Sequence, residues 1–79
     1  MESHAPVRLP GDLRAVRVDV ASGTVTYVGK AAPGLGTSAS EWQILRLTSD
    51  ISGNLTVEWA DGNAEFDNVW DNRASLNYA

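Results

Sequence analysis

Hydrophobic and polar residues alternate along several short stretches of this chain, which is the pattern of half-buried β-strands. Over residues 16–20, three valines alternate with an arginine and an aspartate, a period of two. The small residues 21–23 follow as a turn, and residues 24–28 are rich in β-branched side chains. Together these stretches predict a hairpin with a three-residue loop.

A third strand is predicted over residues 41–48, with an unusual feature. Trp42 and Ile44 point to one side of this strand, whereas Leu45 and Leu47 point to the other. Both faces are therefore apolar, as in strands that are covered on both sides. We expect the core of the domain to cover one face and a neighbouring subunit to cover the other.

The rest of the chain predicts a strand, a turn, a helical turn and a last strand. Residues 55–59 alternate again, and the pair 61–62 is Asp-Gly, a strong turn signal. Apolar residues within 66–70 have helical spacing, which favours one helical turn. Leu76 and Tyr78 then alternate in a predicted fifth strand.

The segment 56–78 also concentrates aromatic, Asp and Asn residues, and it contains no histidine, cysteine or lysine. Asp and Asn at turns, next to aromatic rings, are typical of a rigid, hydrogen-bonded corner between strands. The residues predicted to form this structural corner are Trp59, Phe66, Trp70, Arg73 and Tyr78.

Two segments lack any periodicity. Residues 29–40 carry glycines, a proline and small residues, and they predict a loop. Residues 1–12 contain two prolines and predict an extended arm, either a disordered terminus or a segment that docks on a neighbour through Val7 and Leu9.

We therefore expect an all-β fold: residues 13–79 form a small antiparallel sandwich or partly open barrel of about five strands, preceded by this N-terminal arm.

The size of the chain favours assembly. A domain within 79 residues has little surplus stability. The chain has no cysteine and one histidine, which removes disulfides and disfavours an imidazole metal site. We expect a homo-oligomer, a trimer or a larger shell lattice. The predicted subunit contacts are Val7, Leu9, Leu45 and Leu47.

The net charge and the apolar content of the chain limit the classes of partner that we expect. Six basic residues against ten acidic ones give a formal net charge of −4, which disfavours binding to nucleic acid. No apolar run approaches the roughly 20 residues of a membrane span. The N-terminus has neither the basic nor the apolar region of a signal peptide, so we expect a soluble protein made in the cytoplasm.

The sequence does not match the residue spacing of known cofactor-binding or catalytic motifs. In the glycine loop, no lysine follows Gly36 as a phosphate-binding loop requires. A calcium loop starting at Asp61 has Phe66 where glycine is needed and Asn72 where a bidentate glutamate is needed. A serine-based triad needs His4, which lies in the proline-flanked arm. We therefore expect a non-enzymatic protein without cofactor or metal.

One alternative from another class stays open. Trp42, Trp59 and Trp70 could form a platform for sugar rings if their indoles were exposed. Tryptophans at alternating strand positions more commonly belong to a core. A carbohydrate- or receptor-binding module is therefore the alternative to a structural protein.

A set of short motifs resembles a recurrent pattern over about residues 24–79. They are Tyr27-Val-Gly-Lys-Ala31, Gly36-Thr-Ser38, Trp42-Gln-Ile44, Trp59-Ala-Asp-Gly-Asn63 and Phe66-Asp-Asn-Val-Trp-Asp-Asn-Arg-Ala-Ser-Leu-Asn-Tyr78. The pattern is similar to that of very small structural or uncharacterised proteins of tailed bacteriophages, and the run Phe66-Asp-Asn-Val-Trp-Asp-Asn-Arg73 is its specific part. The resemblance implies a virion component without catalytic residues, whose partners are the major capsid protein or neck and tail subunits. A capsid-decorating or cement role is favoured over a neck, tail or tail-fibre role.

Overall fold

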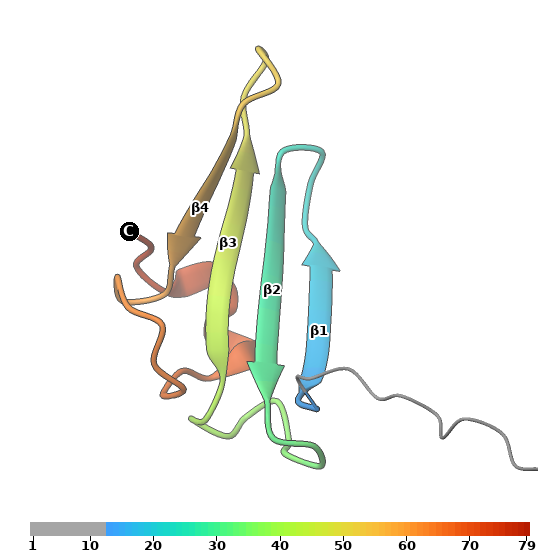
Figure 1. The fold of residues 1–79 in the computed structure, drawn as a ribbon, viewed down its shortest axis with the longest axis vertical. Coiled ribbons are helices and arrows are strands. Elements are labelled where there is room, and N and C mark those ends of the chain that lie inside the picture. The colour runs from blue at the N-terminus through green and yellow to red at the C-terminus, as the bar shows by residue number, and fades with distance from the viewer. Residues whose placement is uncertain (1–12) are drawn as a thin grey trace, which may run out of the picture.

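A computed structural model describes residues 13–79, which form a single sheet backed by a short helix (Figure 1). The strands are β1 (Ala15–Val20), β2 (Val25–Ala31), β3 (Gln43–Ser49) and β4 (Leu55–Trp59). They lie in the order β1-β2-β3-β4, and each pairs antiparallel with the next along the chain. A 3-10 helix, η1 (Trp70–Ser75), follows. The expected all-β, antiparallel fold is confirmed.

Polar side chains form the tight turns between the strands. In the β1–β2 turn, the Ser22 hydroxyl accepts hydrogen bonds from the backbone N–H groups of Thr24 and Val25 at 3.2 and 3.1 Å. In the β3–β4 turn, the Asp50 carboxylate accepts from the N–H groups of Ser52 and Asn54 at 2.8 and 3.0 Å. Hydrogen bonds from Asn54 lower the pKa of Asp50, because they stabilise its ionised form.

The boundary of β2 differs from the prediction. Residues 29–31 were expected to begin a loop, but β2 continues through them and pairs with β3 as far as Lys30 and Gln43. Glycine in a sequence is a typical signal of a loop. In the fold, Gly29 is a buried strand residue whose missing side chain leaves room for the Trp70 ring.

The core lies between the sheet and the C-terminal segment. Its buried apolar side chains are Tyr27, Ala31, Trp42, Ile44, Ala60 and Trp70. The rings of Trp42 and Trp70 pack with their centroids 5.8 Å apart at an interplanar angle of 38°, a tilted contact of the kind that aromatic pairs favour. The helix η1 therefore covers one face of the sheet.

The expected sandwich or barrel of about five strands is not formed by residues 13–79. The C-terminal segment makes isolated bridges, Trp42 with Asn68 and Ala60 with Tyr78, in place of a fifth strand. The helical turn expected over 66–70 begins at Trp70 instead. The C-terminal segment crosses the sheet as a 3-10 helix, which buries Trp70. The expected arm, residues 1–12, lies outside the described residues.

Candidate interaction surface

The register of the strands sorts their side chains into two faces of different character. Successive side chains alternate between faces, and paired residues share a face. On the face opposite η1, one row across the sheet is Val18, Val28, Leu45 and Trp59. The next row on the same face is Val20, Thr26, Leu47 and Val57. Both rows are almost entirely apolar.

This face, here called the open face, has no helix or further strand of residues 13–79 packed on it; at one end, the Gln43 side chain donates to the Ala64 carbonyl at 2.9 Å. In Figure 1 the helix lies behind the strands, and no described segment crosses in front of them. Val18 and Val20 are 61% and 70% exposed, and Leu55 and Val57 are 70% and 52% exposed. The apolar residues of the open face are Val16, Val18, Val20, Val28, Leu45, Leu47, Leu55, Val57 and Trp59.

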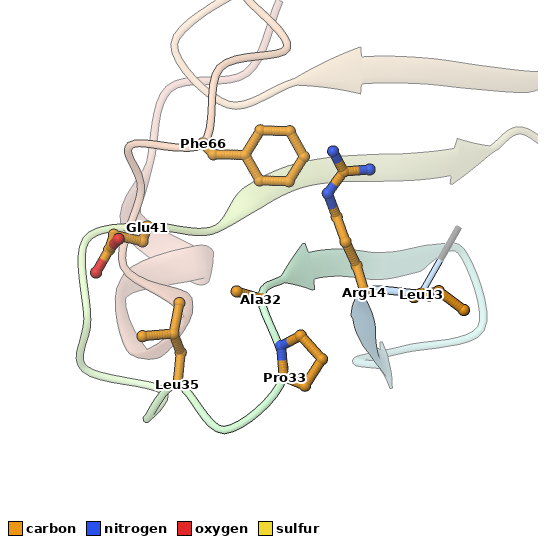
Figure 2. A pocket seen from close by; sticks show the side chains of 7 residues that line it. All are labelled: Leu13, Arg14, Ala32, Pro33, Leu35, Glu41 and Phe66. Atoms are coloured by element: carbon orange, nitrogen blue, oxygen red, sulfur yellow. The ribbon is translucent and has the colours of Figure 1, made fainter. Parts of the chain in front are cut away.

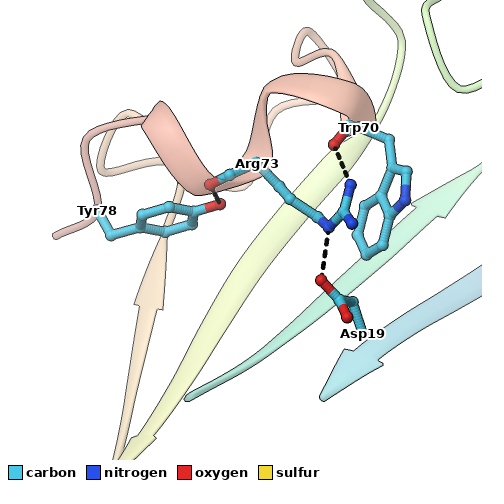
Figure 3. A network of polar contacts seen from close by, with 4 residues as sticks. All are labelled: Asp19, Trp70, Arg73 and Tyr78. Atoms are coloured by element: carbon cyan, nitrogen blue, oxygen red, sulfur yellow. Dashed lines mark hydrogen bonds and ion pairs between the residues drawn. The ribbon is translucent and has the colours of Figure 1, made fainter. Parts of the chain in front are cut away.

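The opposite face is closed by a network centred on Arg73 (Figure 3). The Nε of Arg73 donates to the Asp19 carboxylate at 2.9 Å, and its Nη1 donates to the Trp70 carbonyl at 3.1 Å. The guanidinium carbon also lies 4.6 Å from the centroid of the Trp70 ring, a cation–π contact. Arg73 therefore ties η1 to the edge strand β1.

Tyr78 completes this closure from the C-terminal side. Its hydroxyl donates to the Arg73 carbonyl at 2.7 Å, and its ring lies 5.8 Å from that of Tyr27. Burial raises the pKa of Tyr78 to about 12, because the phenolate would lose hydration. The ring also accepts a cation–π contact from Arg46 at 4.7 Å.

Arg46 is held in turn by a cross-strand ion pair. Its Nη2 donates to the Glu58 carboxylate at 2.6 Å, and β3 and β4 place these residues directly opposite one another. This hydrogen bond raises the pKa of Arg46. The close charged pairs on this face thus bind one another and hold the fold together.

The predicted site residues divide between the two faces. Leu45 and Leu47 lie half-buried on the open face, whereas Val7 and Leu9 lie outside the described residues. Of the predicted corner, Trp70, Arg73 and Tyr78 come together on the closed face.

The other two corner residues lie elsewhere. Trp59 lies on the open face opposite Leu45, and Phe66 packs under the guanidinium of Arg14. Sequence reasoning did not predict that the valines of β1 and the apolar residues of β4 extend the surface around Leu45. Their period of two shows that they share a face of each strand but not that this face is the uncovered one.

A hollow of about 580 Å³ lies at the end of the sheet where β1 begins and β2 ends (Figure 2). Its lining residues are Leu13, Arg14, Ala32, Pro33, Leu35, Glu41 and Phe66. The guanidinium carbon of Arg14 lies 4.6 Å from the centroid of the Phe66 ring. The lining holds one carboxylate and no serine, cysteine or histidine, so it presents no nucleophile paired with a base.

Residues 13–79 were also searched for groups that could bind a metal ion and for helices that could span a membrane. Within this range, no group of three or more His, Cys, Asp or Glu side chains is placed to hold a metal ion. No helix in the same range is long and apolar enough to cross a membrane. In comparisons with known proteins, no family model, no curated protein and no solved structure matches the chain.

Proposed function

We propose that this protein is a non-enzymatic structural component of a tailed-phage particle, which assembles by packing its open face against protein. Within the particle, a capsid-decorating role is favoured over a neck, tail or tail-fibre role. The observation that supports the assembly role is the apolar open face, which spans all four strands.

An antiparallel sheet that keeps one face in water normally places polar residues there. Here the exposed open-face positions of β1 and β4 are valines and a leucine. Soluble monomers rarely expose contiguous apolar patches larger than a few hundred Å², and larger patches mark contact sites. A surface of this kind is stable in solution when another protein covers it.

The charged residues of the strands support the same interpretation. Asp19, Arg46 and Glu58 lie on the closed face, and each takes part in an ion pair there. These groups are therefore held within the fold rather than presented to a substrate.

The phage assignment is supported by the resemblance over about residues 24–79. The most specific part of that resemblance, the run from Phe66 to Arg73, belongs to the segment that covers the closed face of the sheet. A decorating role suits a small acidic domain that binds other subunits through one flat face.

A carbohydrate- or receptor-binding module remains the second candidate, because Trp59 is only partly buried on the open face. However, Trp42 and Trp70 are 1% and 5% exposed, so a platform of three indoles is not formed. The surroundings of Trp59 are aliphatic, whereas a sugar site also needs polar groups that orient the ligand. Quenching of Trp59 fluorescence by glycans would favour this candidate.

The test uses neighbouring residues of β4 that point to opposite faces. Val57→Glu places a charge on the open face, and Thr56→Glu places the same charge on the exposed closed-face side of that strand. Tagged variants are expressed during infection by the virus that encodes the protein, and purified particles are analysed by mass spectrometry.

We expect particles to contain the wild type and T56E and to lack V57E, with all three proteins folded by circular dichroism. Incorporation of V57E at the wild-type level would show that the open face is not the contact surface. Absence of the wild type from the particles would overturn the virion assignment.

A further inference from the structure

We propose that the occupant of the open face is a second copy of this chain, so that two four-stranded sheets pack face to face as a β-sandwich. This inference rests on the proposed role of the open face as a protein contact surface. The second copy supplies each sheet with the second layer that residues 13–79 of a single chain do not form.

The charge distribution favours a second copy over a partner with a charged surface. The charged residues within the strands are Arg17, Asp19, Lys30, Arg46 and Glu58. Only Lys30 shares the open face, at the end of the sheet where it pairs with Val16 and Gln43. The centre of the face therefore offers no charge pattern to select a different protein, and two copies meet without like-charge repulsion there.

The distribution of side-chain sizes also suits a twofold axis that runs parallel to the strands. Such an axis places β1 over β4 of the second copy and β2 over β3. In the central row, the small Val18 then lies against Trp59 of the second copy, and Val28 lies against Leu45 of the second copy. Pairing small with large side chains fills the roughly 10 Å between packed sheets evenly.

The same axis keeps Lys30, the charged strand residue of the open face, away from Lys30 of the second copy. Lys30 and Gln43 are cross-strand partners on β2 and β3, so Lys30 faces Gln43 of the second copy. In the neighbouring row, Val20 and Val57 occupy the outer strands. Val20 therefore faces Val57 of the second copy, which supplies a specific contact to test.

The area of the open face sets the expected affinity of the two copies for each other. Four strands at about 4.8 Å spacing and about 20 Å length give a footprint of roughly 400 Å² per sheet. Side-chain corrugation makes the accessible area larger, so a face-to-face dimer removes on the order of 1,000 Å² from water, near the lower limit of specific interfaces. We expect a dissociation constant in the micromolar range, on the order of 10 μM.

The test is a charge exchange between two variants of the full chain. Val20→Lys and Val57→Glu each put a charge into the interface, and each alone should raise the dimer dissociation constant at least about tenfold in sedimentation equilibrium. In an equimolar mixture, the lysine of V20K lies against the glutamate of V57E, and the second Val20–Val57 contact is intact. The mixture should therefore form a heterodimer more tightly than either variant forms a homodimer.

The matched control is Thr56→Glu, which adds the same charge on the closed face of β4. T56E should dimerise like the wild type, and mixing it with V20K should not restore association. Circular dichroism tests whether each variant keeps the sheet, so that a loss of dimer can be distinguished from a loss of fold.

The outcomes separate this inference from the proposed function. A wild-type chain that stays monomeric to about 1 mM, a hundredfold above the expected constant, overturns the second copy. If V57E is still lost from particles in that case, the open face binds another protein. A chain that dimerises only after residues 2–12 are deleted would show that its own N-terminal segment occupies the face. A dimer that V57E leaves unchanged overturns the open face as the interface.

Discussion

The Trp70 ring lies against the backbone of Gly29, so closely that a Cβ at Gly29 would come within 2.5 Å of the Trp70 Cε3. It would also lie 3.1 Å from Cε3 of Trp42. The bare backbone of β2 is therefore the surface on which the two indoles pack. This contact joins the C-terminal helix to the middle of the sheet and determines which face is closed.

Gly29→Ala should destabilise the domain. The added methyl group overlaps the Trp70 ring, and relief requires a shift of a buried indole, so we expect a loss of about 1–3 kcal/mol in the free energy of unfolding. Gly23→Ala is the control, because a Cβ there meets nothing within 4 Å. Urea unfolding followed by circular dichroism measures both. Equal stability of the two variants would contradict the close packing of Trp70 on β2.

Trp70→Ala should cost about 3–5 kcal/mol, the usual range for a buried tryptophan, because its ring is the centre of the closed face. Trp59→Ala should cost less in dilute solution, since Trp59 is only partly buried on the other face. Thermal and urea unfolding at low concentration compare the two. A folded W70A variant that loses less than about 1 kcal/mol would show that the closed face does not depend on this ring.

The contact between Arg73 and Asp19 should contribute measurably although both are partly exposed. Their side chains are 27% and 35% exposed, which limits the coupling to roughly 0.5–1 kcal/mol. A double-mutant cycle with Arg73→Lys and Asp19→Asn measures it. Lysine cannot reproduce the planar contacts of the guanidinium with Asp19, the Trp70 carbonyl and the Trp70 ring.

Arg17→Lys is the control for this cycle, because Arg17 lies on β1 like Asp19 but is exposed. The stability of R17K should stay close to that of the wild type. Additive effects of R73K and D19N would show that the ion pair does not couple η1 to β1.

Stability should fall in alkaline solution through Tyr78. Its pKa is about 12 in the folded chain against an ordinary value of 10.0. The contribution is fully present below pH 10, because the hydroxyl is protonated in both states there. It is lost as the pH rises towards 12, because the unfolded chain releases the proton first.

After allowance for solvent screening, this loss should be roughly 1–2 kcal/mol. Urea unfolding at several pH values measures it, and absorbance near the tyrosinate band follows the titration. Tyr78→Phe should be less stable than the wild type at neutral pH, because it lacks the hydrogen bond to Arg73, and it should show a weaker alkaline loss. An identical alkaline loss in Y78F would assign the effect to other groups.

Much of the sheet was predictable because its strands are marked by local patterns. The alternation over 16–20 and 55–59 and the Asp-Gly and Ser-containing turns lie where the structure has β1, β4 and their turns. The opposed faces of Trp42 and Leu45 in β3 follow from the pleat of a strand alone. By contrast, the sequence predicts a loop at Gly29, since its role in β2 depends on the Trp70 ring, which lies 41 positions later in the chain.

The sequence by itself determined that this is an antiparallel β domain whose strands carry two distinct faces, since a period of two is a property of each strand alone. Only the tertiary structure decided which face the C-terminal segment covers. That choice depends on contacts between residues far apart in the chain: Trp70 on Gly29, Arg73 with Asp19, and Tyr78 beside Tyr27. These contacts close one side of a single sheet and leave the valines of β1 and the leucines of β3 in the open face, because Asp19, Tyr27 and Gly29, which hold the C-terminal segment, all lie on the same face.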